Sequence, residues 1–248
     1  MDFNFRKPLH IFALLLILLS LIIYILYPIY IFATGKSVSQ FQEITDILNK
    51  TPLGEVYILI SELITAFILM VLIPLIWYVI VNSISFRKAI SRVRITLKNI
   101  DIAFLCGILA AILIYAIISV LSFILLILGE NPTEISNVTD LDFLSPPVLF
   151  LLVTVIPVAE EIFFRGFLLE KIESFAGQNI AIVATSILFG IAHMGYGKLY
   201  PAVFPMIMGL LLAYIVIKTK NLFASIFAHV SFNVVVILLY FFEKYLMT

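Results

Sequence analysis

The chain has 248 residues, of which 63% are hydrophobic and 12% are charged, and its formal net charge is zero. A soluble domain of this length would be roughly half apolar and about one quarter charged, so the composition excludes a soluble globular protein and predicts a polytopic membrane protein. Because the chain has no net positive charge to attract polyanions, we expect no nucleic-acid partner. The single cysteine, Cys106, excludes an intrachain disulfide and any cysteine metal cluster.

Several segments of the chain are long and apolar enough to be membrane-spanning helices, which need about 20 residues each. They lie near 9–33, 56–81, 102–128, 147–169, 179–195, 201–217 and 221–242. The first apolar run is longer than the core of a signal peptide, so we interpret it as a retained span, interrupted near Pro28. The predicted fold is all-α: a polytopic transmembrane helix bundle of about seven spans, or eight if one re-entrant segment has been missed.

Basic residues are concentrated in the short loops on the side of the N-terminus, above all in 84–100, whereas 129–146 contains acidic residues and no basic one. This bias predicts a multi-pass protein of the cell membrane with a cytoplasmic N-terminus. The segment 84–100 is expected to be a basic amphipathic helix on the inner leaflet, or simply the charge that sets the topology. Residues 38–50 show a weaker helical pattern on the outer side.

Glu160, Glu161 and Arg165 are the only charges in an apolar stretch of the fourth span. Ionisable side chains at membrane depth are costly and usually functional. Arg165 follows Glu161 by four residues, so the two can form an ion pair on one helix face. Glu160 points about 100° away and is left to accept a proton from water. A charge cluster that only holds helices together is the alternative.

Two more polar groups follow, His193 in the fifth span and the pair His229 and Asn233 in the seventh. His229 and Asn233 are four residues apart and therefore share a helix face. The only other histidine, His10, has no partner pattern. The rise of about 1.5 Å per residue permits Glu160, His193 and His229 to converge nearer the inner leaflet. Hydrogen bonds between helices are the alternative for each histidine.

These residues resemble the motifs of a known family, the CPBP intramembrane proteases. The matching patterns, each on its own span, are Glu160-Glu161-x-x-x-Arg165, Phe189-x-x-x-His193 and His229-x-x-x-Asn233. The family includes the CAAX prenyl endopeptidases and the Abi-type bacteriocin-processing and immunity proteins. The resemblance covers about residues 147–242 and implies a catalytic core of four helices within 146–248. Residues 1–145 carry no family motif, and their hydropathy predicts N-terminal transmembrane helices with interfacial loops.

The resemblance also implies peptide-bond hydrolysis within the membrane. By position, Glu160 and His193 would activate the attacking water. His229 and Asn233 would polarise the scissile carbonyl and stabilise its oxyanion. Glu161 and Arg165 would orient the site. The implied partner is a membrane-associated polypeptide in the lipid bilayer, such as a prenylated protein or a bacteriocin or leader peptide, cleaved toward the cytoplasmic side.

A metal ion is an alternative that the sequence leaves open. Glu160, His193 and His229 could hold zinc with an open fourth position. The helical zincin signature His-Glu-x-x-His is missing, however, and a glutamate–histidine mechanism needs no metal. We therefore assign no metal ligand and prefer a reaction without a cofactor.

Three other functions are alternatives to hydrolysis. A transporter or proton relay would use the same buried charges but is expected to show internal repeats, which the sequence lacks. A haem held by His193 and His229 leaves the glutamates unexplained. A non-catalytic Abi-type immunity or scaffold protein would bind a peptide without cleaving it, and the sequence does not separate it from an enzyme.

Overall fold

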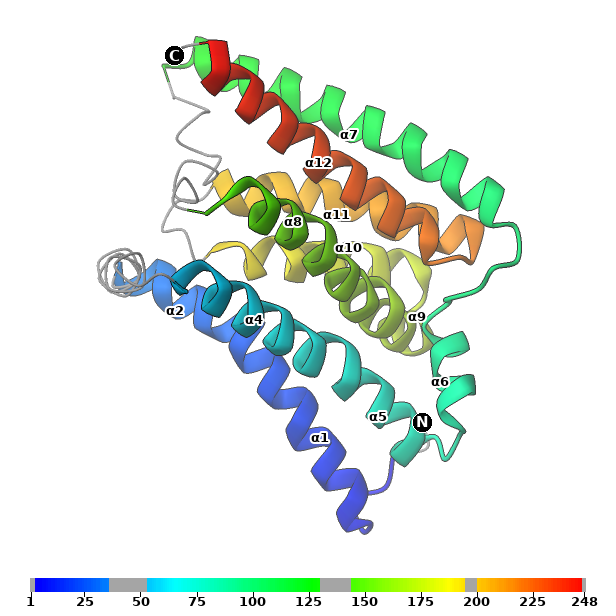
Figure 1. The fold of residues 1–248 in the computed structure, drawn as a ribbon. Helices are drawn as coiled ribbons and strands as arrows, with labels where there is room; N and C mark the ends of the chain where they lie inside the picture. Colours follow the sequence, from blue (N-terminus) through cyan, green and yellow to red (C-terminus); the bar gives the residue numbers. More distant parts are fainter. Residues whose placement is uncertain (1–2, 36–52, 130–143, 195–199, 247–248) are drawn as a thin grey trace.

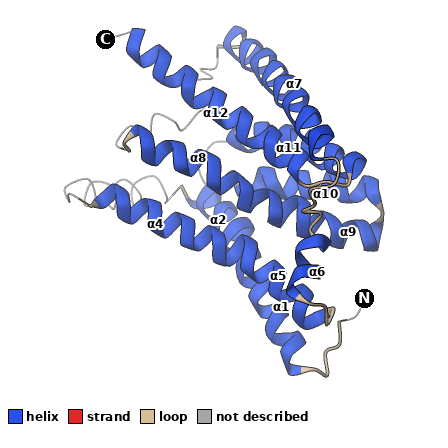
Figure 2. Cartoon of the chain, turned by 45° about the vertical axis from the view of Figure 1, so that its right-hand side comes forward, coloured by secondary structure: helices blue, strands red, loops and turns tan. Residues whose placement is uncertain are grey.

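The computed structural model of the chain describes residues 3–35, 53–129, 144–194 and 200–246. Within these ranges the regular elements are helices and no strand is present (Figure 2). The predicted all-α helix bundle is therefore confirmed. The amphipathic pattern noted at 38–50 lies outside the described residues.

Six helical stretches of the described residues are long and apolar enough to cross a membrane. They are Pro8–Thr34, Gly54–Val81, Ile100–Ile127, Pro146–Ala176, Ala202–Thr219 and Phe223–Leu246. A shorter apolar helix, α10 (Gln178–Ala192), stands at the position of the predicted fifth span and ends three residues before the predicted boundary. The chain is thus an integral membrane protein whose helical segments agree with the hydropathy of its sequence.

The first, second and fourth spans each consist of two α-helices joined without a break by a π-helical segment. These spans are α1 (Pro8–Leu21) with α2 (Tyr27–Thr34), α4 (Gly54–Ala66) with α5 (Ile73–Val81), and α8 (Pro146–Glu161) with α9 (Leu169–Ala176). The π-helical segments are Ile22–Leu26, Phe67–Leu72 and Ile162–Leu168. The predicted interruption near Pro28 therefore takes the form of a π-helical segment rather than a break.

The helices form three groups in space, which Figure 1 and Figure 2 show from two directions. The helices α7 (Ile100–Ile127) and α12 (Phe223–Leu246) pack together on one side. The middle group contains α8, α10 and α11 (Tyr200–Thr219), with α10 and α11 in close contact. The first two spans form the other side, where α1 packs on α5 and α4 packs on α8. The two ends of the chain lie at opposite ends of the bundle (Figure 1).

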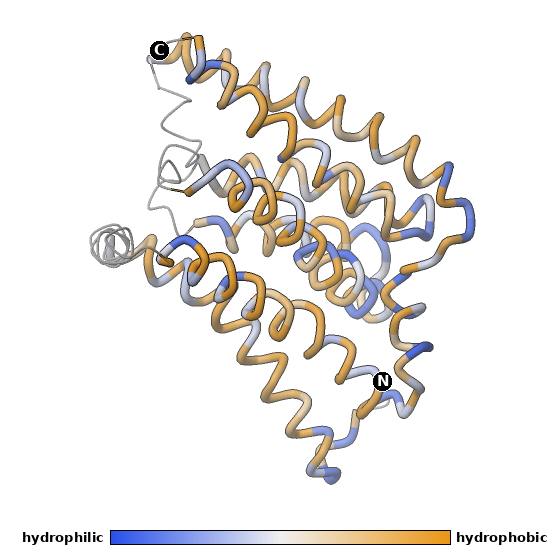
Figure 3. Tube along the Cα trace, viewed as in Figure 1, coloured by the Kyte–Doolittle hydropathy of each residue, from blue (hydrophilic) through white to orange (hydrophobic). Residues whose placement is uncertain are grey.

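The basic segment 84–100 differs from the single amphipathic helix that its sequence pattern suggested. The helix α6 (Phe86–Arg92) ends early, because Arg94 and Asn99 have positive φ angles of 63° and 54°. Arg94 forms an ion pair with Glu173 of α9, and the Asn221 amide donates hydrogen bonds of 3.1 Å to two carbonyls of the loop. The segment is thus bound to the ends of neighbouring helices, where hydrophilic residues gather (Figure 3).

Candidate active site

Glu161 and Arg165 form an ion pair that is fully buried in the bundle. Glu161 is the last residue of α8, and Arg165 lies in the π-helical segment that follows. Arg165 Nη1 donates to Glu161 Oε1 over 2.9 Å, which confirms the ion pair predicted from their spacing. Buried charges are tolerated only when they are paired, so each side chain depends on the other.

His229 connects the two glutamates. Its Nδ1 lies 2.9 Å from Glu161 Oε1, the same oxygen that accepts the hydrogen bond from Arg165. A carboxylate oxygen accepts, so Nδ1 carries the proton of this hydrogen bond, and Nε2 is left for another partner. Nε2 lies 3.7 Å from Glu160 Oε2. Sequence spacing did not predict this contact, because it depends on how α12 packs against α8.

Glu160 differs from Glu161 in its access to the surroundings. The Glu160 side chain is 16% exposed, whereas Glu161 and Arg165 have no exposed surface. The two adjacent carboxylates therefore have different surroundings, one held by buried partners and one open to a small molecule such as water. A group that exchanges a proton with water needs this access.

His193 caps the C-terminal end of α10 and faces the same region. Its Nδ1 is 2.7 Å from the carbonyl oxygen of Phe189, so Nδ1 donates to that oxygen and Nε2 is left free of this contact. His193 also interacts electrostatically with Glu160 and with His229. Three predicted site residues from three helices are thus brought together.

The Phe189 ring is the common packing surface of the site. The Arg165 guanidinium lies over it at 4.0 Å from the ring centroid, a cation–π contact. The rings of His193 and His229 lie against it at centroid distances of 4.7 and 5.7 Å. The sequence marked Phe189 only as part of a motif, and the structure shows that it contacts three charged or polar side chains.

Asn233 lies one turn beyond His229 on α12 and is half-buried. Within the described ranges its side chain makes no hydrogen bond, so its amide is available to a ligand. The structure therefore places Asn233 on the helix that contributes His229 without fixing a partner for it.

Two glycines that bring α10 and α11 together also shape the site. A Cβ atom on Gly209 would lie 3.2 Å from Arg165 Nη2 and 3.1 Å from the backbone of Ser186. A Cβ atom on Gly190 would lie 2.6 Å from the carbonyl oxygen of Ala202. Sequence reasoning missed Gly209, since a glycine in a membrane helix is an ordinary packing residue.

Glu160, His193 and His229 are the side chains considered as zinc ligands. Among the described residues no group of three His, Cys, Asp or Glu side chains is placed to hold a metal ion. The Nδ1 atoms of His193 and His229 both bond to protein acceptors, which leaves Nε2 of each ring for another partner. His229 Nε2 lies 3.7 Å from Glu160 Oε2.

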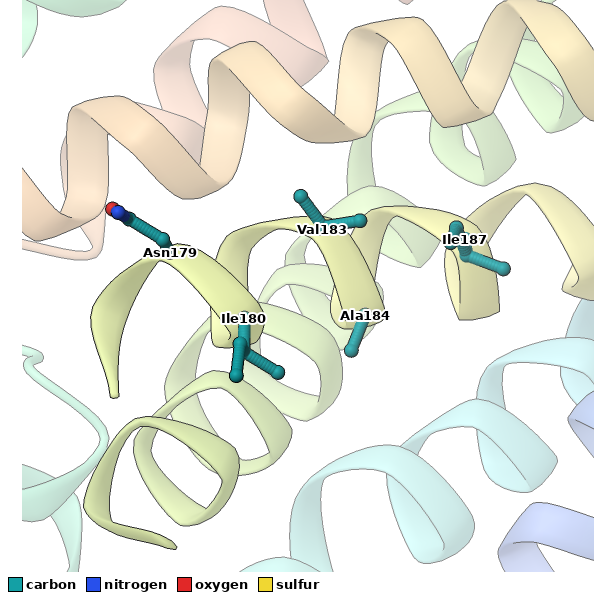
Figure 4. Close-up of a pocket in the computed structure, with 5 residues that line it drawn as sticks. All are labelled: Asn179, Ile180, Val183, Ala184 and Ile187. Carbon is teal, nitrogen blue, oxygen red and sulfur yellow. The ribbon is translucent and has the colours of Figure 1, made fainter. Parts of the chain in front are cut away.

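A shallow hollow of about 380 Å³ lies elsewhere, on the outer face of α10. Figure 4 shows its lining residues, which all belong to this helix: Asn179, Ile180, Val183, Ala184 and Ile187. None of them is a motif residue, and exposed apolar side chains on a helix in a membrane are ordinary lipid contacts. The hollow is therefore not a candidate for the chemistry.

Comparison with known proteins gives a family match over the C-terminal part of the chain. Residues 142–235 match the family model described as type II CAAX prenyl endopeptidase Rce1-like. The matched segment includes every motif residue from Glu160 to Asn233, and it confirms the resemblance to the CAAX proteases drawn from the sequence. No curated protein and no solved structure matches the chain.

Proposed function

We propose, on the premise that residues 142–235 form an Rce1-like type II CAAX prenyl endopeptidase domain, that the protein is an intramembrane endopeptidase. It hydrolyses a peptide bond of a membrane-associated polypeptide. The observation that carries this proposal is the contrast between the two glutamates, with Glu161 bound by Arg165 and His229 and Glu160 partly open beside His229.

In the proposed reaction a water molecule lies between Glu160 and His193. Glu160 takes a proton from this water while the oxygen attacks the carbonyl carbon of the scissile bond. The C–N bond then breaks, and the amine leaves with the proton held by Glu160. Each proton is accounted for by water, Glu160 and the leaving amine, so no step needs a metal or another cofactor.

His229 and Asn233 are proposed to stabilise the oxyanion that forms on the carbonyl. His229 donates a hydrogen bond to Glu161 through Nδ1–H, so it can donate a second one to the oxyanion through Nε2 when both ring nitrogens carry a proton. The Glu161 carboxylate supplies the negative charge beside that cation. A preorganised donor of this kind contributes about 10²–10³-fold to kcat.

Substrate access follows from the position of the site between membrane-spanning helices. The family description names prenyl endopeptidases, so a polypeptide with a lipidated C-terminus is the first candidate substrate. A bacteriocin or leader peptide is the second. We further propose that the site opens toward the cytoplasm, since the basic loops favour a cytoplasmic N-terminus.

The proposal is tested with the purified full chain in lipid nanodiscs and an internally quenched farnesylated peptide. Wild type should cleave it, and Glu160→Gln should lose at least about 10³-fold in kcat while its thermal midpoint stays unchanged. Glu243→Gln, an exposed glutamate at the end of α12, is the matched control and should cleave like wild type.

Three possible results would change the proposal. Cleavage by Glu160→Gln at the wild-type rate would exclude Glu160 as the base. Binding of the peptide without cleavage, by wild type and by Glu160→Gln alike, would favour the scaffold. Cleavage of an unprenylated membrane peptide at the same rate would show that the protein is a protease that does not require a prenylated substrate.

A further inference from the structure

We propose that Tyr24 of the first span is a positioning residue of this site and that Glu62 of the second span orients its hydroxyl. The inference rests on the proposed function and extends it to the N-terminal helices, which carry no family motif. Tyr24 lies in the π-helical segment Ile22–Leu26, and such segments in otherwise regular helices occur often at functional sites.

The packing brings Tyr24 to the helix that carries Glu160. Its ring lies 6.5 Å from the ring of Phe163, a residue of the π-helical segment directly after Glu161. Phe163 in turn packs at 5.2 Å against Phe164, which packs at 5.1 Å against Phe189. A continuous chain of aromatic rings thus joins Tyr24 to the packing surface shared by the two histidines.

Depth in the membrane is consistent with this arrangement. The end of α2 and the starts of α4 and α8 lie at one end of the bundle (Figure 1). A hydrogen bond of 2.8 Å from the Ser145 amide to Glu55 joins α4 and α8 there. Counted from this end, Glu62 lies at about 12 Å, Tyr24 at about 15 Å and Glu160 at about 21 Å. The tyrosine is therefore at an intermediate level between the two carboxylates.

The polar surroundings of Tyr24 show what its hydroxyl can do. The phenol interacts electrostatically with both Glu62 and Glu160. Among the described residues no group forms a hydrogen bond with its hydroxyl, so the single O–H is available. In the proposed arrangement the hydroxyl donates to Glu160 or to the water beside it, and the field of the second carboxylate, Glu62, limits the directions that the hydroxyl dipole takes.

Glu62 then has a function that the sequence did not suggest. It is an ionisable residue inside a span, and such residues are retained in membranes mainly where they serve a polar path. Its helix α4 packs directly against α8, which ends in the two motif glutamates. We infer that the N-terminal half contributes a donor to the site and does not only surround it.

Activity measurements test the inference with the same farnesylated peptide. Tyr24→Phe keeps the ring and removes the hydroxyl, so kcat should fall about tenfold with KM within about twofold and an unchanged thermal midpoint. Tyr27→Phe, on the same span and 57% exposed, is the matched control and should keep wild-type kcat. A wild-type kcat in Tyr24→Phe, or a change confined to KM, would overturn the inference.

A double-mutant cycle tests the part assigned to Glu62. Glu62→Gln should lower kcat, and it should have no further effect in the Tyr24→Phe background, because it acts through the missing hydroxyl. Additive losses in the double variant would show that Glu62 acts by another route. Glu160→Gln, measured in parallel, reports on the proposed function separately, since its result does not depend on Tyr24.

A spectroscopic measurement keeps the inference testable without any turnover. The full chain is labelled with 3-fluorotyrosine, and the Tyr24 resonance is assigned by its loss in Tyr24→Phe. This resonance should shift in Glu160→Gln and in Glu62→Gln, while the Tyr27 resonance stays in place. An unmoved Tyr24 resonance in Glu160→Gln would overturn the inference whatever the peptide assay shows.

Discussion

The imidazole of His229 donates through Nδ1 to Oε1 of Glu161 over 2.9 Å, and Arg165 donates to the same oxygen at the same distance. One buried carboxylate oxygen therefore accepts hydrogen bonds from two side chains of different spans, one cationic and one potentially cationic. This relationship separates the roles of the adjacent glutamates, because Glu161 cannot turn toward a substrate without losing both contacts.

Loss of the Glu161 charge should destabilise the protein. Glu161→Gln leaves Arg165 buried without its counter-charge, which costs about 3–5 kcal/mol in comparable buried pairs. Thermal unfolding in detergent should show a clearly lowered midpoint, with Glu243→Gln as the exposed control. A thermal midpoint equal to that of Glu243→Gln would show that buried Arg165 does not depend on the charge of Glu161. The double variant Glu161→Gln with Arg165→Met should recover part of the stability and none of the activity.

The Phe189 ring should matter for both activity and stability. Phe189→Leu keeps an apolar side chain but removes the aromatic face that contacts Arg165, His193 and His229. We expect a loss of about 1–2 kcal/mol in stability and at least about tenfold in kcat, because the two histidines lose their shared support. The peptide assay and thermal unfolding measure both. Phe242→Leu on exposed α12 surface is the control, and equal kcat in the two variants would refute the prediction.

Alanine at either glycine of the α10–α11 contact should destabilise the protein, and by a different amount at each position. Gly190→Ala places a Cβ atom 2.6 Å from a backbone oxygen of the neighbouring helix, and backbone cannot move aside easily. Gly209→Ala meets its nearest atoms at 3.1–3.2 Å and needs smaller shifts. Overpacking of this kind costs about 1–3 kcal/mol, so both midpoints should fall, and that of Gly190→Ala should fall further. Val183→Ala on the exposed face of α10 should stay near wild type. The reverse order would contradict the packing assigned to this interface.

Chelation should leave the peptidase activity intact. The proposed reaction uses Glu160 and water, and the described residues form no three-ligand metal group. Wild type treated with EDTA and 1,10-phenanthroline, followed by removal of the chelator, should keep its kcat, and metal analysis should find less than stoichiometric zinc. Activity that is lost on chelation and restored by added zinc would overturn this prediction and return Glu160, His193 and His229 to the role of ligands.

Local sequence patterns determined the elements of this fold to a large extent. Length and hydropathy alone located the spans, because a bilayer sets a minimum apolar length for each helix. The Glu161–Arg165 ion pair was also predictable, since four residues along one helix bring two side chains together. The true extent of α6 was not predictable, because Arg94 leaves the helical conformation and its side chain pairs with Glu173, a residue distant in sequence.

Only the tertiary structure decided how the polar groups meet. Helix spacing fixes which residues share a face, but it does not say which helix that face packs against. The contact of His229 with both glutamates, the position of Phe189 under three polar side chains and the approach of Tyr24 to Phe163 all join different spans. The sequence by itself therefore determined which residues carry the charge and on which helix each of them lies. The packing of helices decided which of them are bound and which remain open to react.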